Sequence, residues 1–177
     1  MSGESPIDRA LERRLDAEIR TEMAAAEREA DVLASKRRTI NDVARGSVDR
    51  GDSLTVSAGG AEFSGIGVYA RGDLMTLAAP SAMIEVNLSS VDWIRVDVRA
   101  KAGGRSSPVE AESFPARLGL LELTRELVTV VGRLGTYKVD GRIAAVARDH
   151  AAIVAVDTTE WFVQIAGIAF VVRQIKS

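Results

Sequence analysis

The sequence predicts an α+β protein that is mostly β, with a long N-terminal α-helix followed by two tandem five-stranded small β-barrels. Apolar residues recur at helical spacing in the first part of the chain, and from Asp52 onward they alternate with a period of two. A pattern of short strands and turns then occurs twice, which is typical of a duplicated unit. The predicted organisation is a charged amphipathic helix over 1–46, a first barrel over 47–98, a linker over 99–113, and a short helix with a second barrel over 114–177.

The N-terminal helix is predicted from its end signals and its apolar stripe. Ser5 can cap the helix, Pro6 suits the first helical position, and Gly46 suits its end. Between them the apolar residues recur with a mean step of about 3.67 residues, an eleven-residue rhythm. A small barrel cannot cover so long a helix, which favours self-association of the helix as a coiled coil. Packing against the chain's own barrels is the alternative.

The first β unit is predicted from short alternating or apolar runs separated by turn residues. Five strands in so short a segment cannot bury both faces as a flat sheet, but they can close on themselves. Turns are predicted at Gly59-Gly60, Arg71-Gly72-Asp73 and Pro80-Ser81, between strands at Leu54–Val56, Ala61–Tyr69, Leu74–Ala79, Met83–Leu88 and Val91–Val98.

The second unit repeats letters of the first. Gly65–Asp73 has a counterpart at Gly141–Asp149, offset by 76 residues, with the glycine, the arginine before the turn and the aspartate in common. Val91–Val96 aligns with Ile168–Arg173 after one inserted residue, and Leu54–Val56 aligns loosely with Val130–Gly132. Any two β-hairpins share some features, but agreement in helix order, turn position and strand number favours duplication.

A helix followed by five strands, with Gly-x-hydrophobic before a bent second strand, resembles Sm-like (or SH3-like) small barrels. The sequence departs from the Sm pattern at the positions that hold RNA. No asparagine occurs in Ala70–Thr76 or Ala147–Ala152, and the Arg-Gly or Lys-Gly dipeptide before the last strand is missing in both units. Uridine-type RNA binding is therefore not implied by this resemblance.

The whole chain also resembles an uncharacterised actinobacterial family with a charged N-terminal helix and two such modules. The resemblance lies in Arg117-Leu118-Gly119-Leu120 at the second helix, Gly141-Arg142-Ile143, Asp149, and the final strand Ile168–Arg173. Members are often labelled Fis-family transcriptional regulators. No helix-turn-helix pattern occurs in this sequence to support DNA binding of that kind.

Composition excludes several classes of protein. The formal net charge is -2 and no segment is strongly basic, which disfavours retention on nucleic acid by bulk electrostatics. The chain contains no cysteine, so disulfides, thiolate metal sites and cysteine nucleophiles are excluded. No secretory signal is recognised, and the apolar runs fall short of the roughly 20 residues of a membrane helix. A cytoplasmic protein that does not enter a membrane is expected.

No catalytic, cofactor or metal site is predicted. The single histidine, His150, is more readily explained as a hairpin residue beside Asp149 than as a general base. Gly132–Lys138 lacks the spacing of a phosphate-binding loop. Asp157–Glu160 could offer oxygens to a cation, but acidic turns of this kind are mostly solvated. An enzyme is therefore not expected.

A possible binding surface is predicted from tryptophans and arginines. The two tryptophans suit a binding surface if exposed, although core packing is the commoner use. The arginines could contact phosphates if they converge, whereas ordinary pairing with nearby aspartates is the alternative. The six candidates are Arg71, Arg95, Arg142, Arg148, Trp93 and Trp161.

The function expected from these features is non-enzymatic binding or assembly through protein–protein contacts. The helix could form a homo-oligomer, and exposed strand edges of small barrels suit β-augmentation by a protein partner. The alternative is a regulator of Sm-like type that binds RNA or DNA through its barrels, which the net charge disfavours.

Overall fold

The protein is α+β and mostly β. The computed structural model describes residues 6–101, 103 and 111–175, with side chains of the first helix described from Glu18 onward. Over these residues it contains three α-helices and one antiparallel sheet of ten strands. Residues 1–38 and 39–177 form two compact units, which are treated separately. Ser5 and most of the predicted linker, residues 102 and 104–110, lie outside the described part of the chain.

The N-terminal helix is shorter than predicted, because a second helix begins before Gly46. Helix α1 spans Pro6–Arg37 and helix α2 spans Ile40–Arg50. Thr39 caps α2 through a reciprocal capping box. Its hydroxyl accepts from the Asp42 N–H, and its own N–H donates to the Asp42 carboxylate at 2.9 Å. The spacing of apolar residues continues through Ile40 and Val43, so the sequence pattern gives no sign that one helix ends and another begins at Thr39.

Helix α1, taken by itself, exposes its apolar stripe. Ile19, Met23, Val32 and Leu33 are all exposed within the unit 1–38. None of the described helices combines the length and apolar character that a membrane span requires. Self-association of α1 therefore stays a prediction, supported by an apolar stripe without cover in this unit.

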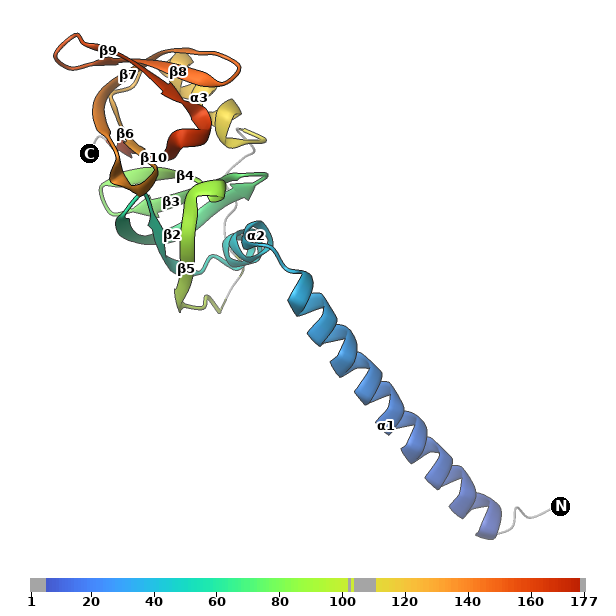
Figure 1. The fold of residues 1–177 in the computed structure, drawn as a ribbon. Helices are drawn as coiled ribbons and strands as arrows, with labels where there is room; N and C mark the ends of the chain where they lie inside the picture. Colours follow the sequence, from blue (N-terminus) through green and yellow to red (C-terminus); the bar gives the residue numbers. More distant parts are fainter. Residues whose placement is uncertain (1–5, 102, 104–110, 176–177) are drawn as a thin grey trace. The chain divides into compact units, whose positions relative to one another are not determined.

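The ten strands form one open series (Figure 1). Their order is β5-β1-β2-β3-β4-β10-β6-β7-β8-β9, and each neighbouring pair is antiparallel. Helix α3, Phe114–Thr124, begins where the sequence predicts a second helix. The strands are β1 Ser53–Ala58, β2 Ala61–Arg71, β3 Leu74–Ala79, β4 Ala82–Asn87, β5 Val91–Val98, β6 Val128–Gly132, β7 Lys138–Val146, β8 His150–Ala155, β9 Glu160–Gln164 and β10 Ile168–Gln174.

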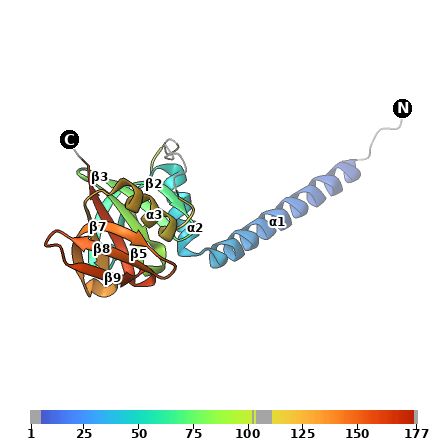
Figure 2. The ribbon, with the colours of Figure 1, turned by 90° about the horizontal axis from the view of Figure 1, so that it is seen from above.

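The two halves have the same internal order, since β10-β6-β7-β8-β9 repeats β5-β1-β2-β3-β4. Irregularities recur at matching places as well. The β2–β3 register shifts between Gly67 and Tyr69, and the β7–β8 register shifts 76 residues later, between Ile143 and Ala145. Helices α2 and α3 are both 11 residues long and both end at a residue of left-handed conformation. Helix α2 packs on β2, and α3 packs on β7 (Figure 2).

The predicted alignment of the first strands was off by two residues. Leu54 pairs with Gly65 in the first half, and Val128 pairs with Gly141 in the second. Leu54 therefore corresponds to Val128, and not to Val130 as the sequence comparison suggested. The loose letter match misled here because alternating apolar strands look alike when shifted by two positions.

The strand pairing does not show two separate closed barrels, because β4 of the first half pairs with β10 of the second. This seam matches Phe170 with Val86 and Gln174 with Ala82. Two buried apolar clusters lie mainly one in each half, but Leu74 of the first half belongs to the cluster of the second, and Val131, Ala169 and Phe170 belong to that of the first. Edge strands expose unpaired N–H and C=O groups, so joining β4 to β10 satisfies one edge of each half.

Asp52 connects the end of α2 with the segment that follows β5 through hydrogen bonds. Its buried carboxylate accepts from the Arg50 side chain at 2.8 and 3.0 Å and from the Ala100 N–H at 3.0 Å. Burial by itself would raise the pKa of Asp52. The hydrogen bonds from Arg50 and Ala100 and the charges of Arg50 and Arg99 outweigh it, so the pKa lies below the usual value.

This lowered pKa predicts an acid-sensitive contribution to stability. The folded carboxylate is favoured above the unfolded pKa of about 3.9, and its contribution is lost as the pH falls through the lower folded pKa. Asp52→Asn should therefore have a lower free energy of unfolding than wild type at pH 7, and the difference between the two proteins should become smaller below about pH 4. Urea unfolding across this pH range measures the difference. A difference that does not depend on pH would contradict a stabilising role for the charged carboxylate.

Candidate functional site

The two free edges of the sheet are the most distinctive surface of the described chain. Strand β5 pairs only with β1, and β9 pairs only with β8, among the described residues. The chain has two tryptophans, and one lies on each edge: Trp93 on β5 is 36% exposed and Trp161 on β9 is 41% exposed. Phe162, next to Trp161, is 68% exposed. These edges combine free backbone groups with exposed aromatic rings.

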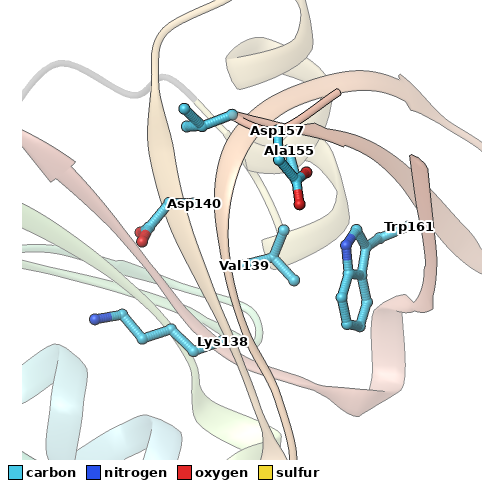
Figure 3. A pocket seen from close by; sticks show the side chains of 7 residues that line it. Lys138, Val139, Asp140, Ala155, Asp157 and Trp161 are labelled. Carbon is cyan, nitrogen blue, oxygen red and sulfur yellow. The ribbon is translucent and has the colours of Figure 1, made fainter. Parts of the chain in front are cut away.

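A pocket of about 390 Å³ lies beside the β9 edge (Figure 3). In the close view Val139 lies in the middle, between the indole of Trp161 on one side and the carboxylate of Asp140 on the other. The pocket is thus apolar at its centre and charged at its rim, which suits an amphipathic side chain. Its lining residues are Lys138, Val139, Asp140, Ala155, Val156, Asp157 and Trp161.

The two aspartates that line this pocket accept hydrogen bonds from neighbouring threonines of the same chain. The Thr129 hydroxyl donates to the Asp140 carboxylate, and the Thr159 N–H donates to Asp157 at 3.0 Å. The Thr159 hydrogen bonds hold the pKa of Asp157 below its usual value. No group of three or more His, Asp or Glu residues in the described chain is arranged to hold a metal ion.

The β5 edge carries a small polar network around Trp93. The Arg95 guanidinium lies 5.9 Å from the centre of the Trp93 ring and 2.6 Å from the Asp97 carboxylate. The Thr55 hydroxyl also donates to Asp97 at 2.5 Å. Hydrogen bonds from Thr55 and then Arg95 lower the pKa of Asp97, so its charge offsets that of Arg95.

The other candidate arginines lie on elements other than β5. Arg71, at the end of β2, pairs with Glu112 at 2.9 Å. Arg142 lies on β7, and Arg148 lies in the β7–β8 turn. Both are exposed.

His150 begins β8, and its Nδ1 lies 2.8 Å from the Asp149 carboxylate. Hydrogen bonding to His150 holds the pKa of Asp149 below its usual value. The imidazole also lies 6.1 Å from the exposed Phe162 ring. This pair belongs to the β7–β8 hairpin, as the sequence predicts.

A charged cluster at the seam was not predicted. Glu85 on β4 is fully buried, and it accepts from Thr76 at 2.6 Å, from Arg117 at 2.8 Å and from Arg173 at 3.2 Å. Arg173 also pairs with Glu126 at 3.1 Å. The available signal was a single glutamate inside the apolar run Met83–Val86, because a charge in a buried strand needs a partner.

No protein-family model matches this sequence, and no curated protein matches it significantly.

Proposed function

We propose that this chain is a non-enzymatic binding and assembly protein that holds protein partners by strand addition at its free sheet edges. Each half is taken as an Sm-like five-stranded small-barrel module of the tandem family that the sequence resembles. The repeated strand order and the matching bulges support this interpretation. The exposed stripe of α1 supports a further role in self-association.

The observation that carries the proposal is the unprotected character of the β9 edge. Edge strands are usually blunted by lysine, proline or a bulge. Strand β9 reads Glu-Trp-Phe-Val-Gln, with neither lysine nor proline, and it pairs with β8 without a register shift. An exposed Trp–Phe pair on such an edge is the kind of surface that partners bind.

The alternative, nucleic-acid binding through the arginines, receives less support from the geometry. Arg71, Arg95 and Arg173 each pair with a carboxylate. Phosphate contacts need basic groups gathered on one face, and the net charge is -2. A protein partner is therefore preferred.

The proposal predicts that Phe162→Glu removes partner binding while the fold persists, because a charge opposes burial of this edge. The full chain, its Phe162→Glu variant and a Leu123→Glu control should be purified under the same conditions and their bound proteins identified by mass spectrometry. Leu123 is 78% exposed on α3, outside both edges. Bound proteins should persist in the control and be lost from Phe162→Glu.

Two results would contradict the proposal. One is retention of the same protein partners by Phe162→Glu with an unchanged melting temperature. The other is copurified nucleic acid, seen as raised absorbance at 260 nm, with an affinity that falls steeply with salt.

A further inference from the structure

A second pocket, of about 780 Å³, lies where the seam meets the end of α3. The strand registers bring its walls together. Met83 pairs with Arg173 across the seam, and Arg173 pairs in turn with Val128 of β6. Val128 pairs with Gly141, the residue before Arg142 on β7. The lining of this pocket includes no residue of β5 or β9, so the pocket is separate from both free edges.

Three arginines line this pocket, and they differ in their ion pairs. Arg173 is balanced by Glu85 at 3.2 Å and by Glu126 at 3.1 Å. Among the described residues no carboxylate forms an ion pair with Arg125 or Arg142. Glu126 is the acidic residue of the lining, and it is already paired with Arg173. The pocket therefore carries two positive charges that an anionic ligand would neutralise.

Arg125 has a backbone conformation that usually selects glycine. It ends α3 with a φ of 51°, in the left-handed region. The equivalent residue at the end of α2 is Gly51, with a φ of 75°. This conformation is unfavourable for a residue with a Cβ, and a basic residue could complement the helix dipole from the preceding turn without that cost. Side chains held in such conformations are concentrated at functional sites.

The first half serves as an internal reference, because it has the same strand order without these charges. The packing of the repeated unit therefore does not require an arginine at any of the three positions. The equivalent residues of the first half are Gly51 for Arg125, Ile66 for Arg142 and Val96 for Arg173.

The wall beside the arginines is partly apolar. Leu127 is 56% exposed and Ile175 is 47% exposed, and Met83 lines the pocket with them. The volume lies within the range of pockets that hold small ligands. Nucleic acid needs a charged track along a surface, whereas these arginines share one pocket, so a small molecule suits it better.

We propose that this pocket binds a small organic anion, whose carboxylate or phosphate group is held by Arg125 and Arg142 and whose apolar part packs against Leu127 and Ile175. Guanidinium groups bind two oxygens of such anions at once in a planar geometry. The ligand would touch both halves, because Met83 lies on β4 and Arg142 lies on β7. This role goes beyond strand addition at the free edges and does not depend on it.

Isothermal titration of the full chain tests the proposal with four probes: phenyl phosphate, phenylacetate, inorganic phosphate and neutral benzyl alcohol. At least one of the two aromatic anions should bind, and the tighter of the two identifies the class of acidic group. Inorganic phosphate should bind more weakly than phenyl phosphate, because it has no apolar part. Benzyl alcohol should not bind. The bound anion should also raise the melting temperature.

Two variants remove the proposed charges. Arg125→Gly and Arg142→Gln should each raise the dissociation constant of the bound anion about tenfold, since each removes a charge-assisted hydrogen bond. Arg125→Gly should melt at or above the temperature of wild type, because glycine suits the left-handed conformation. Arg148→Gln is the matched control. It makes the same change of charge at an exposed residue outside the pocket lining, and should change the dissociation constant less than about twofold.

Several results would overturn the proposal. One is the absence of binding by both aromatic anions, and another is benzyl alcohol or inorganic phosphate binding as tightly as the better of them. Equal weakening by Arg148→Gln and Arg142→Gln would indicate a general effect of net charge. Weakening by Arg142→Gln alone, with a lower melting temperature and no effect of Arg125→Gly, would indicate a structural role for Arg142 instead.

Discussion

Glu85→Ala is expected to lower the free energy of unfolding by about 3–5 kcal/mol, because it leaves two arginines at the seam without their shared carboxylate. Arg117 is nearly buried, and both it and Arg173 hydrogen-bond to Oε1 of Glu85. The Thr76 hydroxyl loses its acceptor on Oε2 at the same time. Breaking one side of a buried ion pair is costly because the remaining charge stays in a medium that solvates it poorly.

Urea unfolding of the full chain measures this effect. Glu126→Ala is the matched control, since Glu126 pairs with the same Arg173 at an exposed site and should cost less than about 1 kcal/mol. Equal losses in the two variants would show that the buried cluster does not stabilise the seam.

Gly141→Ala is expected to cost about 2–3 kcal/mol, because a Cβ at this position meets backbone and not a movable side chain. It would lie 2.4 Å from the carbonyl oxygen of Val154 on the adjacent strand. The equivalent glycine of the first half, Gly65, would meet the Ala78 carbonyl at 2.7 Å. Strands β7 and β8 would therefore have to separate where they bend.

Thermal and urea unfolding should be compared with Gly119→Ala as the control. A Cβ on Gly119 meets nothing within 4 Å, and the residue lies inside α3. The free energy of unfolding of this variant should therefore rise by about 0.5–1 kcal/mol. If both alanine variants raise stability, the inference that β8 lies too close to Gly141 for a Cβ is wrong.

Local patterns predicted the strands well, and the reasons are physical. Alternation of apolar and polar residues reports a strand with one buried face, and paired turn residues such as Gly59-Gly60 mark its ends. The 76-residue repeat also marked the glycine that both bent strands share, Gly65 and Gly141. These features are local, so a single sequence contains them.

The seam and the edges could not be predicted in the same way. Pairing of β4 with β10 joins residues more than 80 positions apart, and no local pattern specifies which edge meets which. Trp93 and Trp161 were singled out as possible contact residues, but nothing in the sequence placed them on opposite free edges. No local pattern predicts that Arg173 pairs with Glu85, because Glu85 lies on a strand of the other half.

The buried charges at the seam also affect which strand can pair with β4. Where β10 carries Arg173, β5 carries Val96, and where α3 carries Arg117, α2 carries Val43. An intruding β5 from another molecule would bring Val96 in place of Arg173, so Glu85 would keep Arg117 but lose its second arginine, and exchange of that strand between chains is penalised. The β4–β10 seam therefore favours pairing with β10 of the same chain. The free β9 edge has Phe162 at the position of Glu85, so it carries no buried charge that selects one particular strand.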